Sequence, residues 1–216
     1  MLKLRALRTV PVPLLLLTAT MPPPMEDRAL LFFSSNFSVI RTQSTSRPNL
    51  QYNIEKLPRN ANILLFTIFI GDYVKRNLEN GKAIVFCKTI GTATILHKNL
   101  QLYAGLSAHM YLSKQEAEEK RTNFLNWLND PSQYPLMVTT SAFDLGVDCP
   151  NVLIIVHYQF PYSLLDYAQQ TGRAGRDGSE SKCMLYFVEE EQLLLERMKD
   201  QKADSSPIDD IEMMLK

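Results

Sequence analysis

The chain has 216 residues, of which 45% are hydrophobic and 21% charged, values close to those of ordinary globular domains. This composition excludes a generally disordered chain, a collagen-like repeat and a coiled coil, and the length allows one full domain with part of a second. The 23 basic and 23 acidic residues cancel, so any contact with nucleic acid must depend on a local basic site.

The N-terminal segment has two interpretations. Three basic residues within the first eight precede an apolar stretch over residues 10–17, as in a signal peptide, and a secreted protein is the alternative class. Two prolines interrupt that stretch, no small-residue cleavage motif follows it, and it is far shorter than the roughly 18 residues of a membrane span. We favour a buried strand over residues 13–17, apolar because both of its faces are covered.

Short apolar runs alternate with longer amphipathic stretches along the rest of the chain, which is typical of βαβ units and a mostly parallel sheet. The predicted fold class is therefore α/β. The expected extended segments are 39–41, 50–56, 83–87, 136–139, 152–156 and 184–188. The expected helices are 22–33, 63–80, 92–102, 113–129, 163 toward 172, and 189–202, followed by an acidic tail over 203–216.

Two capping boxes and one turn mark element boundaries. Ser113 with Glu116, and Ser163 with Asp166, have the spacing at which side chains cap a helix N-terminus. The sequence Arg-Pro-Asn at residues 47–49 predicts a turn, because proline disfavours helix in the residue before it, and we place the boundary between lobes there. The first of the two capped helices is expected to bury Phe124, Leu125, Trp127 and Leu128.

The most informative segment is 169–178, Gln-Gln-Thr-Gly-Arg-Ala-Gly-Arg-Asp-Gly. If the preceding helix continues through it, Gln169, Arg173 and Arg176 stand at i, i+4 and i+7 on one stripe that suits a polyphosphate. Its first two glycines would each cost roughly 1 kcal/mol in helix propensity, which indicates a need for close backbone approach. The alternative is a glycine-rich surface turn with two solvated arginines.

A second polar cluster follows the strand expected at 136–139. Thr139 would lie at its carboxyl end and Thr140 and Ser141 beyond it, where parallel sheets bind ligands. Hydroxyl groups and free backbone N–H groups can hold a nucleic-acid phosphate without reading base sequence. The alternative for these hydroxyls is a capped turn.

Five sequence blocks, in this order, resemble motifs III to VI of the RecQ family of superfamily-two DNA helicases. They are Thr-Ala-Thr at 18–20, Arg-Pro-Asn at 47–49, Ile-Val-Phe-Cys at 84–87, the stretch 140–151, and 169–178. The last two blocks are the most specific, and the prolines at 22–24 resemble the fungal telomere-linked branch.

The resemblance covers about residues 13–188 and implies a RecA-like parallel sheet flanked by helices, the C-terminal domain of a P-loop NTPase helicase, with an incomplete first lobe. It divides the chain into a remnant of the first lobe with the interlobe linker (1–45), the helicase C-terminal domain (46–188), and a C-terminal helix with an acidic tail (189–216). The implied activity is that of the second motor lobe of an ATP-dependent 3′ to 5′ DNA helicase.

The resemblance assigns roles on the nucleotide side of this lobe. Arg176 matches the family's arginine finger, and Arg173 and Gln169 match its partners near the γ-phosphate. Asp148 and Gly146 match positions that face the nucleotide. The implied cofactor is ATP with Mg²⁺, bound only with a complete first lobe.

The resemblance also assigns a nucleic-acid side. Thr140, Thr89 and Lys88 match positions near the backbone of single-stranded DNA. Thr18 and Thr20 match the block that couples hydrolysis to lobe movement. The implied partners are single-stranded or partly duplex DNA and the missing first helicase lobe, with no membrane, and the implied location is the nucleus, in DNA repair and recombination.

Four positions depart from the family pattern. Asp144 replaces a glycine, Cys149 a lysine, and Ile90 an arginine. Tyr111 replaces the glycine that follows His109, which leaves that histidine more typical of a structural or solvated loop residue. Because phosphate contacts carry most non-specific affinity, an added acid and two lost bases predict weaker DNA binding.

Several expected motifs are absent from these 216 residues. Gly81-Lys82 lacks the upstream glycine and following hydroxyl of a Walker-type loop, and no Asp-Glu-x-His box precedes Thr18. The three cysteines have no C-x-x-C spacing, so we expect no zinc or other metal site, no disulfide framework, and a reducing compartment. We therefore expect no ATP hydrolysis from this chain alone. Two functions stay open: a partial RecQ-like helicase, or a non-catalytic module that binds nucleic acid or protein.

Overall fold

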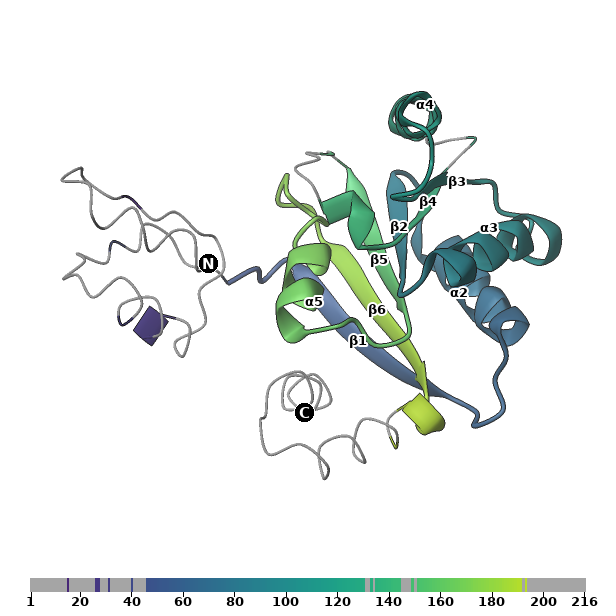
Figure 1. The fold of residues 1–216 in the computed structure, drawn as a ribbon, viewed down its shortest axis with the longest axis horizontal. Coiled ribbons are helices and arrows are strands. Elements are labelled where there is room, and N and C mark those ends of the chain that lie inside the picture. The colour runs from purple at the N-terminus through teal and green to yellow at the C-terminus, as the bar shows by residue number, and fades with distance from the viewer. Residues whose placement is uncertain are drawn as a thin grey trace. The chain divides into compact units, whose positions relative to one another are not determined.

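The computed structural model describes residues 46–130, 135–144 and 151–191, with the single residues Leu15, Glu26, Asp27, Leu31, Ile40, Gln133, Cys149 and Leu193. The chain divides into two compact units, residues 1–46 and 47–216. The second unit holds all the strands and numbered helices named below (Figure 1).

The second unit is built on one parallel sheet of six strands in the order β1-β6-β5-β2-β4-β3. The central strand β2 is buried along its whole length, because helices cover both faces of the sheet. The strands are β1 (Leu50–Leu57), β2 (Lys82–Cys87), β3 (Ala108–Tyr111), β4 (Leu136–Thr139), β5 (Val152–Tyr158) and β6 (Ser181–Val188).

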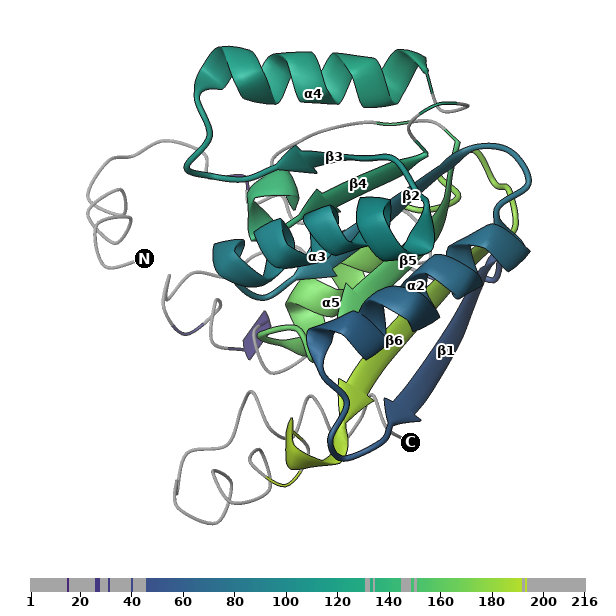
Figure 2. The same cartoon turned by 90° about the vertical axis from the view of Figure 1, so that its right-hand side faces the viewer.

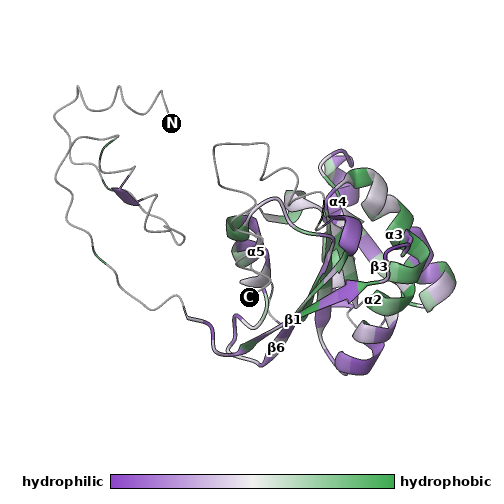
Figure 3. Ribbon diagram, turned by 90° about the horizontal axis from the view of Figure 1, so that it is seen from below, coloured by the Kyte–Doolittle hydropathy of each residue, from purple (hydrophilic) through white to green (hydrophobic). Residues whose placement is uncertain are grey.

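Four α-helices and one short 3₁₀ helix cover the sheet: α2 (Ile63–Asn77), α3 (Ile90–Ala104), α4 (Ala117–Asn129), η2 (Ser141–Asp144) and α5 (Leu164–Thr171). Helices α2 and α3 lie side by side on one face, and α5 lies on the other (Figures 2 and 3). Alternate strand residues therefore enter two separate cores. Val85 and Ile154 pack beneath α2 and α3, while Ile84 and Ile155 pack with Trp127 of α4.

Most of the expected elements in this unit are confirmed. The strands at 50–56, 83–87, 136–139, 152–156 and 184–188 all form, and the turn at residues 47–49 is closed by Leu50 N–H donating to Arg47 C=O at 3.1 Å. The Ser163 hydroxyl caps α5 by accepting from Asp166 N–H at 3.1 Å, as its capping box predicts. Helix α2 ends at Asn77, before the predicted 80, because Leu78 is already extended.

The capping box predicted at Ser113 and Glu116 does not form. Helix α4 begins at Ala117, and its N-cap, Glu116, makes no side-chain capping hydrogen bond. The Gln115 side chain instead accepts from Leu112 N–H at 2.6 Å, and this closes a turn where the first helical turn was expected. On the helix, Trp127 is fully buried and Phe124 and Leu128 are partly buried, but Leu125 is 39% exposed.

The strand β3 was not expected from the sequence. It is only four residues long and partly buried throughout, so it lacks the apolar run that marks the central strands. His109 lies in this strand and not in the predicted loop.

Few residues of the first unit are described. Leu15 is 76% exposed and not in a strand, so the buried strand expected at 13–17 is wrong at that residue. Glu26, Asp27 and Leu31 are helical, as expected for 22–33. Ile40 is not in a strand, and the rest of the extended segment expected at 39–41 lies outside the described residues.

The C-terminal helix is described only at its start. Residues 189–191 and Leu193 are helical, and the rest of the expected helix, with the tail, lies outside the described residues. In the part of the chain that the structure describes, no helix is both long and apolar enough to cross a membrane.

Candidate functional site

The segment 172–178 forms successive turns, so the predicted helical stripe of Gln169, Arg173 and Arg176 is wrong. Helix α5 stops at Thr171, and the chain reverses at Gly175, whose φ of +55° is the left-handed conformation that glycine tolerates. Gly175 N–H then donates to Val152 C=O at 2.9 Å, at the beginning of β5. The glycine-rich turn of the alternative is correct, but its two solvated arginines are not, since Arg173 is buried.

The two arginines of this turn have opposite environments. Arg176 is exposed, as is Gln169 on α5. Arg173 is 7% exposed, and its guanidinium carbon lies 5.9 Å from the centre of the Phe143 ring. Arg173 therefore packs inward against Phe143, which follows the hydroxyl residues at the end of β4. It does not share a surface with Arg176 and Gln169.

The Phe143 ring belongs to an aromatic cluster that also holds Trp127 and Tyr111. Phe143 contacts both rings edge to face, at centroid distances of 5.8 and 5.2 Å. Tyr111, which stands where the helicase family has glycine, is thus a packing residue on this face. Cys149, at the family's lysine position, is also buried.

The turn at residues 47–49 contacts the arginine-bearing segment directly. Arg47 donates from one guanidinium nitrogen to Ala174 C=O at 2.7 Å and Gly175 C=O at 2.8 Å, and from another to Gly172 C=O at 3.4 Å. The Asn49 amide donates to Gly175 C=O and Ser179 C=O, each at 2.9 Å. Sequence reasoning missed this contact, since no local pattern links residues more than 120 positions apart.

The other candidate residues lie at the carboxyl ends of β2 and β4. Thr89 caps α3 by accepting from Thr92 N–H at 3.1 Å. Thr140 is buried, and its hydroxyl accepts from Ala142 N–H at 3.4 Å at the start of η2. The capped-turn alternative is therefore correct for Thr140, and the same structural role applies to Thr89.

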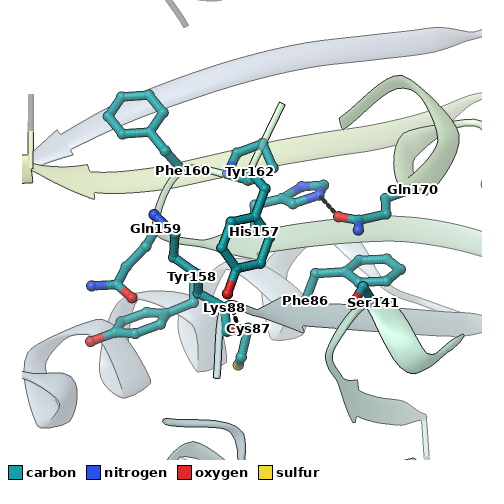
Figure 4. Close-up of a pocket in the computed structure, with 11 residues that line it drawn as sticks. Phe86, Cys87, Lys88, Ser141, His157, Tyr158, Gln159, Phe160, Tyr162 and Gln170 are labelled. Atoms are coloured by element: carbon teal, nitrogen blue, oxygen red, sulfur yellow. Dashed lines mark hydrogen bonds between the residues drawn. The ribbon is translucent and has the colours of Figure 1, made fainter. Parts of the chain in front are cut away.

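Lys88 borders a small cavity at this edge of the sheet (Figure 4). Its ammonium group lies 5.4 Å from the centre of the Tyr162 ring, and the Tyr162 hydroxyl donates to Lys88 C=O at 3.1 Å. The cavity has a volume of about 20 Å³, which is room for one water molecule and far too little for a nucleotide. Among the polar residues that line the cavity, Ser141 and Tyr162 are exposed and Lys88 is partly buried.

Two polar groups at this edge, the buried His157 and the partly buried Glu191, were not anticipated from the sequence. His157 in β5 stacks on Phe86 at a centroid distance of 5.4 Å, and burial lowers its pKa to about 4. Glu191 accepts from Phe160 N–H at 3.0 Å, and burial raises the pKa of its carboxyl group to about 7, an effect that Lys88 and this hydrogen bond reduce. For His157, the available sequence signal was an apolar strand that ends in His-Tyr.

The remaining candidates divide between described and undescribed residues. Burial lowers the pKa of His109, partly offset by its hydrogen bond with Asn123. Ile90 begins α3. Thr18, Thr20, Gly146, Asp148 and the Asp144 side chain lie outside what the structure describes. All three cysteines are buried and free, and no group of three or more His, Cys, Asp or Glu residues in the described ranges could hold a metal ion.

The fold matches that of solved structures. Over 91% of this chain and 51% of the other, it resembles the structure of S. cerevisiae Dbp5 bound to RNA and ADP BeF3, with a TM-score of 0.64 at 18% identity. It also resembles Mss116p bound to ssRNA and AMP-PNP, over 73% of this chain and 31% of the other, with a TM-score of 0.59 at 22% identity. The parallel sheet with helices on both faces is therefore a RecA-like fold of the helicase C-terminal type.

The chain belongs to the family of helicase conserved C-terminal domains, whose model matches residues 61–178. Related curated proteins are RecQ-family helicases. The chain is 30% identical to the RecQ-like DNA helicase blm-1 of Caenorhabditis elegans over 87% of this chain and 18% of that protein. It is 34% identical to the ATP-dependent DNA helicase Q1 of Pongo abelii over 68% and 22%, and 32% identical to the ATP-dependent helicase SGS1 of Saccharomyces cerevisiae over 82% and 12%. It thus spans less than a quarter of each of these relatives.

Proposed function

We propose that the chain acts as the second motor lobe of a RecQ-like, ATP-dependent 3′ to 5′ DNA helicase, with Arg176 as its arginine finger. One observation carries the proposal: Arg176 is exposed, while the backbone beside it is fixed by hydrogen bonds from Arg47 and Asn49 to Ala174 and Gly175. An arginine finger needs this combination, because a guanidinium stabilises transition-state charge best when it is already in place.

The other roles follow from the same proposal. ATP with Mg²⁺ would be held mainly by a first lobe, which carries the phosphate-binding loop, and Gln169, Gly146 and Asp148 would complete the nucleotide side. Arg173 would support the nucleotide side from within, since its guanidinium packs on Phe143 and joins the arginine-bearing turn to η2. Thr18 and Thr20 would couple hydrolysis to movement of the lobes.

Single-stranded DNA would run along the carboxyl edge of β2 and β4. Lys88 would supply the positive charge there, and the first-turn N–H groups of α3 that Thr89 does not cap would supply neutral donors to phosphates. Work on chromosomal DNA would require the protein in the nucleus.

The test joins the full chain to a first lobe that carries a Walker-type loop and an Asp-Glu-x-His box. The chain alone should hydrolyse no ATP with single-stranded DNA, and the fusion should do so. Arg176→Ala should lower kcat by about 10³ to 10⁵ while sparing ATP binding, as removal of a finger does in GTPases. Arg76→Ala is the control, since Arg76 is exposed on α2, where it pairs with Asp72 at 3.2 Å. Equal turnover in both variants would contradict the finger assignment, and a fusion that hydrolyses no ATP would favour the non-catalytic module.

A further inference from the structure

The contact between the turn at 47–49 and the segment 172–179 combines two kinds of donor. Arg47 spans the neighbouring carbonyls of Ala174 and Gly175 from one nitrogen, and Asn49 joins Gly175 to Ser179 through one amide. All acceptors are backbone oxygens, so these bonds fix the path of the chain whatever side chains it carries. Charge-assisted bonds from arginine are about twice as strong as neutral ones.

Steric fit at Gly175 makes the contact tighter. A Cβ atom placed there would lie 2.4 Å from the Asn49 amide nitrogen and 2.5 Å from Ser179 C=O. The φ of +55° also disfavours any residue with a side chain. The two segments therefore meet with no space for adjustment, directly before Arg176.

The sheet anchors both partners. Ser181 N–H donates to Asn49 C=O at 2.9 Å, and Leu50 and Ser181 are then paired as the first residues of β1 and β6. Gly175 is held from the other side by Val152 C=O, at the start of β5. The turn and the arginine-bearing segment are consequently fixed to three adjacent strands, and Arg176 is the exposed group that projects from this frame.

We propose that Arg47 and Asn49 are positioning residues for Arg176: they hold the backbone of 174–179 so that this guanidinium stands at a fixed place before nucleotide binds. The catalytic consequence of this inference rests on the proposed function. The structural role, in which Arg47 and Asn49 hold the segment, does not. Neither residue touches substrate in this proposal, and both act through Arg176.

The first measurement uses the full chain alone. Amide hydrogen exchange of peptides covering 172–179 should accelerate by roughly 10-fold or more in Arg47→Lys and Asn49→Asp, with α3 unchanged. Lysine cannot reproduce the planar fork, and aspartate places an acceptor against two carbonyls. Arg76→Lys and Asn53→Asp, the same changes at exposed positions, should leave the segment unchanged. Unaltered exchange in both test variants would overturn the positioning role.

The second measurement is a double-mutant cycle in the two-lobe fusion. Asn49→Asp should lower kcat by roughly 10- to 100-fold with the KM for ATP changed less than about threefold, and should have almost no further effect in an Arg176→Ala background. Equal losses in both backgrounds would mean that Asn49 only stabilises the fold, and no loss would also refute the inference. If Arg176→Ala itself keeps full turnover, the proposed function fails, and the exchange measurement still decides whether the turn holds the segment.

Discussion

His157 in β5 donates from Nε2 to Gln170 Oε1 at 2.9 Å, and this buried hydrogen bond joins the middle of the sheet to the last turn of α5 (Figure 4). A carbonyl oxygen can only accept, so this ring nitrogen carries the proton. The imidazole stays neutral because burial disfavours its charged form. Gln170 is thereby fixed two residues before Gly172, where the arginine-bearing turn begins.

The neutral state of His157 predicts that low pH destabilises the fold. Its pKa falls from the ordinary 6.5 to about 4, so between these values the unfolded chain binds more protons. The free energy of unfolding, relative to that of His157→Gln, should therefore rise by roughly 1 to 3 kcal/mol from pH 4 to 6.5 and be constant above. Urea unfolding across this range measures the difference. A flat difference would show that His157 titrates normally.

Glu191 should act in the opposite direction. Its pKa is raised from 4.5 to about 7. The stability that the protonated carboxyl group contributes is therefore fully present below pH 4.5 and is lost as pH rises through 7. Glu191→Gln keeps an oxygen that can accept from Phe160 N–H, and should stabilise the chain at pH 8 by an amount on the order of 1 kcal/mol, with little effect at pH 4.5. The control is Glu190→Gln, a surface residue paired with Arg59, which should change stability little. Equal effects at both pH values would contradict the assignment.

Gly175→Ala should be far more disruptive than Gly178→Ala. Both glycines have positive φ, +55° and +88°, but a Cβ at Gly178 meets no atom within 4 Å, whereas at Gly175 it collides with Asn49 and Ser179. We expect losses of roughly 2 to 4 kcal/mol at Gly175 and about 1 kcal/mol at Gly178, measured by chemical unfolding. Similar losses would mean that backbone strain, and not the close contact, decides the outcome.

DNA binding by the chain alone should be weak, with a shallow dependence on salt. The net charge is zero, and two family positions for basic residues hold Ile90 and Cys149. Lys88→Ala should reduce the magnitude of the log–log salt slope for single-stranded DNA by roughly 0.7, one phosphate contact, and exposed Lys98→Ala by nothing. Fluorescence anisotropy at several salt concentrations measures both slopes. Tight binding that persists at high salt would refute this account of the surface.

The sequence was sufficient for elements whose signals are local. The apolar run of β2 and the Ser163 cap of α5 were predicted correctly because burial on both faces and a capping hydroxyl leave clear patterns. The end of α5 beside Gly172 was also predicted, but the stripe of Gln169, Arg173 and Arg176 required the helix to continue beyond it, and turns follow instead. The roles of Arg47 and Asn49 were missed because their partners lie on a distant part of the chain.

The pairing of β1 with β6 also determines when the sheet can be completed during synthesis. These strands are the first and last of the sheet in chain order, yet they are neighbours in register from Leu50 to Leu57. During synthesis, more than 120 further residues must be added after β1 before its partner β6 leaves the ribosome. Non-local pairings of this kind form slowly. Its hydrogen-bonding edge is exposed to other chains throughout that delay. A nascent chain stalled before residue 181 would therefore be a target for chaperones or for aggregation, even with β2, β4 and β5 already assembled.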